Sequence, residues 1–308
     1  MQFVDWVAAD WGTSNLRIWA IAPDGSAHPV AESGHGMSRL APGEYAGVLN
    51  NTCSTLSRAD GRPIEVVICG MAGARQGWLE APYVEAPTPL GLLGAHAVRP
   101  PDAGPRLRPS ILPGICIRRP GSEDVMRGEE TQLLGLSALR PGFSGTVILP
   151  GTHSKWARME GDSLAHFSTA MTGDLFHAMA GHTVLSLSLT SADKDTMTPE
   201  GIAAGLADGL ESPHRLTAML FRVRAASLLS GRDAAWCLGY LSGLLVGAEV
   251  GGHLDWIAGQ DVVPVLGSPN LTPIYLQALA LAGIAGEAVD GAGATIAGLK
   301  AAYSRERT

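Results

Sequence analysis

The sequence has few charged residues and few cysteines, and these shortages exclude several classes of protein. Charged residues make up 17% of the 308 positions, where about 25% is usual for soluble domains. No basic run occurs and the formal net charge is −7, which argues against nucleic acid as a partner. The four cysteines are far apart and form no CxxC pair. We therefore expect reduced thiols in the core rather than disulfides or a metal site.

No secretory signal and no membrane-spanning segment are predicted. Asp5 interrupts the first apolar run and no basic residue precedes it, unlike a signal peptide. The most membrane-like segment, "AAWCLGYLSGLLVGAEVGG", is bounded by Asp233 and Glu249. That is too short for the roughly 20 apolar residues that span a bilayer. We expect a buried, glycine-rich core helix and a cytoplasmic protein without a membrane partner.

Several well-known functional motifs are also missing. The chain contains neither the P-loop pattern GxxxxGK[ST] nor the dinucleotide-binding pattern GxGxxG. It has no GxSxG, so His153 and Ser154 do not belong to a hydrolase nucleophile turn. His166, His177 and His182 lack the spacing of zinc ligands.

The remaining pattern is that of an α/β protein with two related halves. Hydrophobic residues make up 46% of the chain, enough for a large core. The stretches 3–25 and 143–176 both run from an apolar strand through a turn of glycine and hydroxyl residues into a second extended segment. We predict domains at 1–140 and 141–292, with a final helix, 293–308, that can pack back on the first.

The other predicted elements follow from periodicity and from turn residues. Residues 64–70 are predicted as a buried strand, and the proline-rich stretch 98–124 as loops around one short strand, 110–117. A helix is expected at 122–139, rich in glutamate near its start. The second half is expected to contain helices at 198–210, 215–229 and 233–250, and a strand, loop and helix over 261–283.

A tight turn in "DWGTSNLR" is the first candidate for binding phosphate. Gly12 lets the backbone approach a phosphate, and Thr13 and Ser14 offer hydroxyl donors. Asp10, at the end of the strand, is the candidate for holding Mg²⁺, usually through water. Arg17 either approaches phosphate or pairs with a surface acid. An ordinary hairpin turn is the alternative, since the same residue types suit turns.

A second turn of this kind occurs in "LPGTHSKW", midway along the chain. Gly151, Thr152 and Ser154 are its candidate donors, with Lys155 beside them as a further phosphate-binding candidate. Two such turns can hold the β- and γ-phosphates of one nucleotide from both sides.

Five stretches taken together resemble a known family. In chain order they are "DWGTSNLR", "CGMAGARQGWLEAPYVEAP", "MRGEETQLLG", "LPGTHSKW" and "MTGDLF". This set resembles the 2-dehydro-3-deoxygalactonokinase family, within the superfamily of actin, hexokinase and Hsp70. The resemblance covers most of the chain, although the last third matches mainly by pattern at "VPVLGSPNLTP". It implies an α/β, two-domain actin-like ATPase (ribonuclease H-like) architecture with the nucleotide in the interdomain cleft.

The resemblance also implies a general base near the start of the predicted helix. "RGEETQLLG" resembles the Gly-Asp-Gln-Gln stretch of the wider carbohydrate kinases, in which the aspartate is the base. Aligning Gly128 places Glu129 at that position, with Glu130 as the alternative. A third reading is that both acids only stabilise the helix N-terminus, by a few tenths of a kcal/mol to about 1 kcal/mol.

The loop "GMAGARQGW" is the candidate for binding the sugar acid, because ligands gather where α/β strands end. Arg75 is predicted to bind the carboxylate in bidentate fashion, Gln76 to contact a hydroxyl, and Trp78 to form a pocket wall. The alternatives are a surface ion pair for Arg75 and plain core for Trp78.

Two further segments are nucleotide-side candidates. Thr172, Gly173 and Asp174 in "MTGDLF" are interpreted as nucleotide-contacting or hinge residues. Gly267 and Ser268 precede a helix and suit a loop that contacts the nucleoside, although a plain strand-to-helix turn explains them equally well.

The function that the resemblance implies is a kinase using ATP and Mg²⁺ in carbohydrate metabolism. It phosphorylates the 6-hydroxyl of 2-dehydro-3-deoxy-D-galactonate, a step in galactonate degradation. The alternatives are a kinase for another sugar or keto-deoxy sugar acid, such as the gluconate epimer, and an actin-like nucleotide-gated binding protein. A homo-oligomer is compatible with the sequence.

Overall fold

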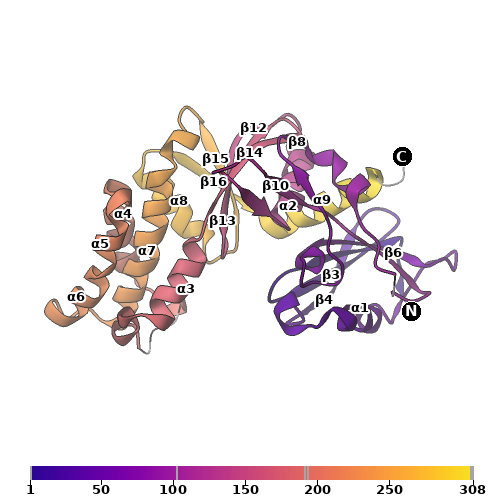
Figure 1. Cartoon of the computed structure of the whole chain (residues 1–308), viewed down its shortest axis with the longest axis horizontal. Helices are drawn as coiled ribbons and strands as arrows, with labels where there is room; N and C mark the ends of the chain where they lie inside the picture. Colours follow the sequence, from indigo (N-terminus) through magenta and orange to yellow (C-terminus); the bar gives the residue numbers. More distant parts are fainter. Residues whose placement is uncertain (1, 102, 191, 193, 306–308) are drawn as a thin grey trace. The chain divides into compact units, whose positions relative to one another are not determined.

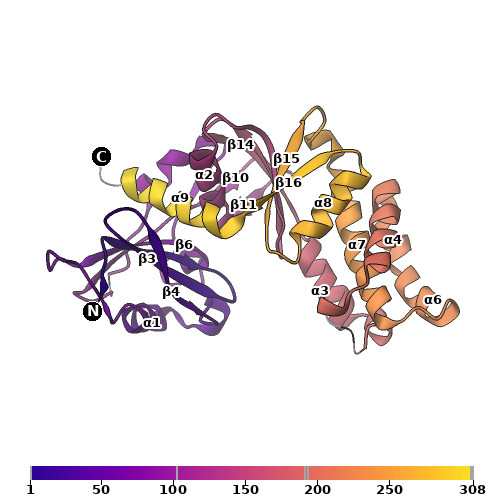
Figure 2. The same cartoon turned by 180° about the vertical axis from the view of Figure 1, so that it is seen from behind.

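The computed structural model describes residues 2–101, 103–190, 192 and 194–305. The chain divides into two compact units (Figures 1 and 2). Unit 1 comprises Met1–Ser144, Met159–His166 and Gly291–Thr308, and unit 2 comprises Gly145–Arg158 and Phe167–Asp290. The division falls near the predicted boundary after residue 140, but the segment 159–166 belongs to unit 1. Residues 306–308 of the predicted last helix lie outside the described residues.

Unit 1 is built on a five-stranded mixed sheet. Its strand order is β4-β3-β2-β6-β9. The first three strands pair antiparallel, whereas β2, β6 and β9 run parallel. Buried residues from both faces of β2 and β6 pack into the core, as expected for central strands. The strands are β2 Trp6–Trp11, β3 Leu16–Ile21, β4 Ala27–Ser33, β6 Ile64–Gly70 and β9 Leu107–Ile111.

Unit 1 also contains the helices α1 (Tyr45–Thr52), α2 (Glu129–Leu139) and α9 (Gly291–Arg305). Helices α2 and α9 lie side by side in both views (Figures 1 and 2). Glycines make this close packing possible, because a Cβ on Gly135 would lie 1.8 Å from the carbonyl oxygen of Ala294, and one on Gly298 would lie 1.9 Å from that of Thr131. The helix α2 is therefore supported by a segment far from it in the sequence.

Short strands complete unit 1 and correct two predictions. The proline-rich stretch holds β9 and β10, rather than one strand over 110–117. The predicted helix 122–139 begins only at Glu129, because residues 124–126 form β11, and Gly128 has a φ of 112°. The short strands are β1 Gln2–Phe3, paired with β5 Leu56–Ser57; β7 Tyr83–Glu85, β10 Gly114–Ile117 and β11 Asp124–Met126 in one small sheet; and β8 Thr88–Pro89, paired with β14.

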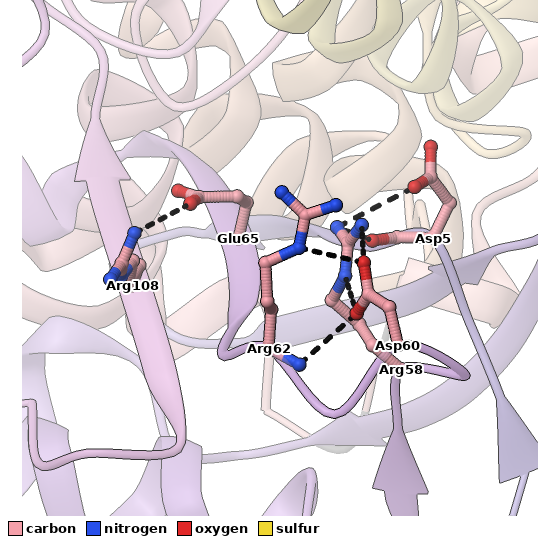
Figure 3. A network of polar contacts seen from close by, with 6 residues as sticks. All are labelled: Asp5, Arg58, Asp60, Arg62, Glu65 and Arg108. Carbon is pink, nitrogen blue, oxygen red and sulfur yellow. Dashed lines mark hydrogen bonds and ion pairs between the residues drawn. The ribbon is translucent and has the colours of Figure 1, made fainter.

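Ion pairs secure one edge of unit 1 (Figure 3). Arg58 donates to both oxygens of Asp60 through Nε and Nη2, at 3.0 Å each, and to the backbone carbonyl of Asp5 at 2.8 Å. Arg62 Nε contacts Asp60 at 2.8 Å, and these hydrogen bonds lower the pKa of Asp60. Glu65 and Arg108 pair across the neighbouring strands β6 and β9. These arginines are thus engaged with acids of the same surface.

Unit 2 repeats the strand order of unit 1. Its main sheet runs β16-β15-β12-β13-β14. In this order the five strands occupy the places that β9, β6, β2, β3 and β4 occupy in unit 1. β12, β15 and β16 are parallel. This repetition agrees with two related halves, and the α/β class is confirmed. The strands are β12 Ser144–Leu149, β13 Ser154–Glu160, β14 Ser163–Ala170, β15 Val262–Gly267 and β16 Ala285–Asp290.

Two glycine-rich helices form the centre of the helical part of unit 2. Glycines recur at every fourth position on both α4 and α7, and a Cβ on Gly205 or Gly243 would lie 2.2 Å from a backbone oxygen of the other helix. α7 has the length and apolar composition to cross a membrane, but 78% of its most apolar 18-residue stretch is buried within the protein. The predicted buried core helix is confirmed. The helices are α3 Thr172–His182, α4 Pro199–Glu211, α5 Leu216–Leu220, α6 Arg222–Leu229, α7 Ala234–Gly252 and α8 Thr272–Leu281.

Some local predictions were incomplete. The helix expected at 215–229 is divided into α5 and α6 at Phe221, and α1 and α3 were not predicted. The cysteines are all free and buried, as expected. Short 3-10 helices occur at Met37–Arg39, Pro42–Glu44, Met71–Gly73, Leu90–Leu92, Gly94–His96, Val184–Ser188, Lys194–Thr196, Pro213–Arg215 and Leu254–Trp256.

Candidate functional site

The turn after β2 is fixed from one side by a second loop of unit 1. The carbonyl groups of residues 12–14 accept hydrogen bonds from the amides of residues 36–38, at 2.9 to 3.3 Å. A Cβ on Gly36 would lie 2.3 Å from the carbonyl carbon of Ser14, so this approach requires glycine. Within the described ranges the amides of Thr13 and Ser14 have no hydrogen-bond acceptor in the protein, and both side chains are exposed. Two amides and two hydroxyls are thus available to an anion.

Asp10 lies directly before this turn, on β2. Its neighbours across the sheet are Arg17 on β3 and Cys69 on β6. Arg17 Nη2 donates to Asp10 Oδ2 in a partly buried ion pair. The structure therefore shows Arg17 pairing with an acid, one of the two predicted alternatives, and that acid is the candidate metal ligand.

Two glycines bring the start of α2 to the same edge of the sheet. Gly70, the last residue of β6, has a φ of 89°, and a Cβ there would lie 2.7 Å from the carbonyl oxygen of Trp11. Gly128, directly before α2, lies against Gly70, since its Cβ would be 3.5 Å from the Gly70 Cα. Cys69 Sγ lies 3.8 Å from Asp10 Oδ1, and burial, followed by the carboxylates of Asp10 and Glu130, raises the pKa of this thiol.

The two glutamates at the start of α2 have different environments. Glu130 is fully buried; its Oε2 accepts the Gly128 amide at 2.7 Å and its Oε1 accepts the Thr131 hydroxyl at 3.2 Å. Burial, and then the neighbouring Glu129, raise the pKa of Glu130 to about 7. Glu129 is partly exposed and its Oε2 accepts the Arg127 amide at 3.1 Å. Of the two, only Glu129 has a surface that a substrate can reach.

The loop after β6 contains the three predicted substrate residues in different settings. Arg75 is exposed, with 81% of its side-chain surface accessible, and its Nε lies 3.5 Å from Glu80 Oε1. Gln76 is also exposed. Trp78 is only 7% exposed and packs against Trp11 and Tyr45, with ring centroids 6.2 and 6.0 Å away. This packing agrees with the alternative given for Trp78, a core residue.

In unit 2 the second turn is packed against the first turn of α3. A Cβ on Gly173 would lie 2.6 Å from the carbonyl oxygen of Gly151 and 2.7 Å from the Cα of Thr152. The Asp174 amide donates to the Thr152 carbonyl at 3.0 Å. The side chains of Asp174 and His153 form a partly exposed pair at 2.6 Å. "LPGTHSKW" and "MTGDLF" are thus packed together, and α3 begins at Thr172 within the second of them.

Two of the predicted donors in this turn face inward. Ser154 is fully buried and its hydroxyl contacts that of Tyr275 at 2.8 Å. Lys155 is 4% exposed and donates from Nζ to Thr169 Oγ1 at 2.8 Å. They are the first two residues of β13, and both faces of this strand are buried where it begins. This differs from the prediction that they bind phosphate, which leaves Gly151 and Thr152 as the accessible part of the turn.

Gly267 and Ser268 lie at the end of β15, beside the same turn. β12 and β15 are parallel neighbours, so the loops that follow them open at one edge. A Cβ on Gly267 would lie 3.3 Å from the ring of Pro150, directly before Gly151. Ser268 is exposed, and its carbonyl accepts the Thr272 amide at the start of α8. The nucleotide-side candidates of unit 2 therefore gather around one turn.

Two residues that support these sites, Gly36 and Arg127, were not predicted from the sequence, because no motif marks either of them. Gly36 supports the first turn only through backbone contacts. Arg127 is 9% exposed and donates from Nη2 to the Ala81 carbonyl at 2.8 Å, which connects the loop after β6 to the residue before Gly128. Among the residues that the structure describes, no group of three or more His, Cys, Asp or Glu side chains could hold a metal ion. A single carboxylate with a nearby phosphate is an arrangement that suits Mg²⁺, which keeps several waters.

Comparisons with known proteins cover nearly the whole chain. A family model described as "2-keto-3-deoxy-galactonokinase" matches residues 10–302. A protein of Rhizobium meliloti (strain 1021) named "Probable 2-dehydro-3-deoxygalactonokinase DgoK1" is 41% identical over 297 residues, 96% of each chain. The "2-dehydro-3-deoxygalactonokinase" of Escherichia coli (strain K12) is 35% identical over 295 residues, again 96% of each chain.

A solved structure gives the same result. The crystal structure of a 2-dehydro-3-deoxygalactonokinase-like protein from Sinorhizobium meliloti is 40% identical, with a TM-score of 0.88. It covers 97% of this chain and 95% of its own. The chain therefore belongs to the 2-keto-3-deoxy-galactonokinase family.

Proposed function

We propose that this protein transfers the γ-phosphoryl group of ATP to the 6-hydroxyl of 2-dehydro-3-deoxy-D-galactonate, giving 2-dehydro-3-deoxy-6-phosphogalactonate and ADP. Family membership supports the reaction class and the substrate. One observation carries the assignment to residues. In unit 1 the phosphate-type turn, Asp10 and the start of α2 with Glu129 meet at one edge of the sheet, through the contact between Gly70 and Gly128.

Glu129 is the proposed general base. Phosphoryl transfer to an alcohol requires a carboxylate that accepts the hydroxyl proton as the bond to phosphorus forms. Glu130 is unsuited to this role because its carboxyl group is enclosed and already bonded to Gly128 and Thr131. The partly exposed carboxylate of Glu129 is held by the Arg127 amide, which orients it without enclosing it.

Asp10 is proposed to hold Mg²⁺, through water, beside the phosphates. The metal would neutralise charge on the transferred group and on the leaving oxygen. The residues fit this role: a carboxylate lies at the end of a strand, directly before a turn whose amides and hydroxyls suit phosphate oxygens. Arg17 compensates the charge of Asp10 and keeps its carboxylate in one orientation.

The nucleotide is proposed to contact unit 2 at Gly151 and Thr152, with the loop at Gly267 and Ser268 near the nucleoside. The first turn of α3 supports this role, because the N-terminus of a helix favours anions. Asp174 is proposed to support this part of the nucleotide site as the partner of His153, with which its side chain forms a pair.

Arg75 and Gln76 remain the proposed contacts of the sugar acid. The ion pair between Arg75 and Glu80 is long and exposed, and such pairs contribute about 0 to 1 kcal/mol. The guanidinium can therefore exchange this partner for a substrate carboxylate at little cost in free energy.

The direct test is ADP formation from ATP and Mg²⁺ with a panel of acceptors. The panel contains the keto-deoxy acids of galactonate and gluconate, neutral sugars, and no acceptor. Stimulation by the galactonate-derived acid, with kcat/KM above that of its epimer, supports the proposal. ADP formation that is independent of any acceptor would instead indicate a nucleotide-gated protein.

A further inference from the structure

A buried glutamate in the apolar helix α7 connects three elements around the second turn. Glu249 is 7% exposed. Its Oε1 accepts the Trp156 indole N–H at 2.8 Å, and its Oε2 accepts the Tyr275 hydroxyl at 2.7 Å and the Thr172 hydroxyl. The three donors belong to β13, α8 and α3. One carboxylate thus accepts hydrogen bonds from side chains of three separate elements.

The contacts continue to both ends of the turn. Since the Tyr275 proton is donated to Glu249, the Ser154 hydroxyl donates its own proton to Tyr275, at 2.8 Å. Ser154 is the first residue after the turn. On the other side, Thr172 begins α3, directly before Gly173, which packs on Gly151 and Thr152. Glu249 is therefore connected to the turn by hydrogen bonds on two sides, through Tyr275 to Ser154 and directly to Thr172.

A buried acid in this place needs an explanation beyond stability. Burial raises the pKa of Glu249, and its three donors oppose that effect. Well-packed apolar residues often stabilise a core as well as, or better than, a buried charged group. A hydrogen-bonded carboxylate instead fixes the directions of its partners, as supporting residues do around functional sites.

We propose that Glu249 is a positioning residue for nucleotide binding: through Thr172 and through Tyr275 and Ser154, it sets the conformation of Gly151 and Thr152. The inference rests on the proposed function, in which this turn contacts the phosphates of ATP. Glu249 itself touches no substrate.

The test is calorimetric binding of ADP in the absence of sugar acid, together with steady-state kinetics. Glu249→Gln keeps the shape but loses one accepting oxygen. We expect its Kd for ADP and its KM for ATP to rise about tenfold, the scale of one lost hydrogen bond. The KM for the sugar acid should stay within about twofold. Thr172→Val should weaken ADP binding similarly, whereas Thr172→Ser, which keeps the hydroxyl, should bind like the wild type.

A matched control lies on the same helix. Tyr240→Phe removes the hydrogen bond from Tyr240 to Asp208, which is 2.6 Å long. It should lower the melting temperature without changing the Kd for ADP. Equal weakening by Tyr240→Phe would overturn the inference, because any lost core hydrogen bond would then have the same effect. So would wild-type ADP binding by folded Glu249→Gln and Thr172→Val.

If Glu249→Gln fails to fold, the comparison of ADP binding by Thr172→Val and by Thr172→Ser tests the inference without it. Wild-type protein that binds neither ADP nor ATP would overturn the proposed function, and this inference with it. Wild-type protein that binds ADP normally, with variants that match it, would overturn this inference only.

Discussion

Asp10 and Arg17 occupy directly opposite positions on β2 and β3, and their side chains form an ion pair at the end of the hairpin. The pair lies beside the turn whose amides and hydroxyls are available to an anion. A carboxylate that is already oriented loses little conformational freedom when a hydrated metal binds.

Replacing Asp10 by Asn should weaken the use of Mg²⁺. An amide carries no charge to attract the hydrated ion, so the apparent affinity for Mg²⁺ should fall about 10- to 100-fold, the usual effect of losing an outer-sphere partner. The measurement is the rate as a function of Mg²⁺ at saturating ATP and acceptor. An unchanged Mg²⁺ dependence in a folded variant would remove Asp10 from the metal site.

Replacing Glu129 by Gln should lower kcat by about 10² to 10⁴, the usual contribution of a general base. The KM for ATP should change little, because Glu129 is not proposed to contact the nucleotide. Circular dichroism and thermal unfolding serve as the folding control. A kcat within threefold of the wild type would show that another group accepts the proton.

Glu130 should make stability depend on pH. Its pKa is about 7 in the folded protein and near its ordinary 4.5 in the unfolded chain. Between these values the folded protein binds a proton that the unfolded chain has lost, so the free energy of unfolding falls as pH rises from about 4.5 through 7. The amplitude from this group should be on the order of 3 kcal/mol.

The measurement is urea denaturation at pH 5 and at pH 8, for the wild type and for Glu130→Gln. The variant should lose less stability than the wild type over this interval. Equal losses in the two proteins would show that Glu130 does not titrate in this range.

Replacing Arg75 by Lys should raise the KM for the sugar acid about tenfold, because lysine cannot form the planar two-bond contact with a carboxylate. The matched control is Arg62→Lys, which changes another exposed arginine paired with an acid, in the network of Figure 3. That control should leave every kinetic constant unchanged. A wild-type KM in the Arg75 variant would show that Arg75 does not bind the substrate carboxylate and forms only a surface ion pair.

Replacing Gly298 by Ala should destabilise the protein although alanine is the better helix former. The added Cβ would lie 1.9 Å from the carbonyl oxygen of Thr131, so α9 would have to move away from α2. Overpacking of this kind costs about 1 to 3 kcal/mol.

The matched control for Gly298 is Gly47→Ala in α1, where nothing lies within 4 Å of the new Cβ. It should raise the free energy of unfolding by up to about 1 kcal/mol. Urea denaturation of both variants measures the contrast, and a destabilised Gly47 variant together with a neutral Gly298 variant would contradict this account of the packing.

The sequence predicted those parts of the structure that depend on local patterns. Apolar runs predicted the strand at 64–70 and the helix α7. Glycine and hydroxyl residues predicted the turns at Gly12 and Gly151. Helix α2 was placed too early, because the run of polar residues before it also suits a helix. The positive φ of Gly128 and the pairing of β11 with β10 decide where it begins.

The remaining features depend on contacts between distant segments. No local pattern shows that Trp78 packs on Trp11 and Tyr45 rather than lining a pocket. Ser154 is likewise indistinguishable from an accessible donor until β13 is seen to direct it toward Tyr275. The proposed preference for Glu129 over Glu130 rests on burial, which is a property of the folded chain.

The packing of α9 on α2 has a consequence for protein synthesis. The helix that carries Glu129 is translated early, whereas the glycine-bearing helix that covers it leaves the ribosome only after all of unit 2. Unit 1 therefore cannot complete its packing during translation of its first segment, because Gly291–Thr308 also belongs to it. The support that α9 gives to α2 is thereby delayed until the whole of unit 2 has been translated.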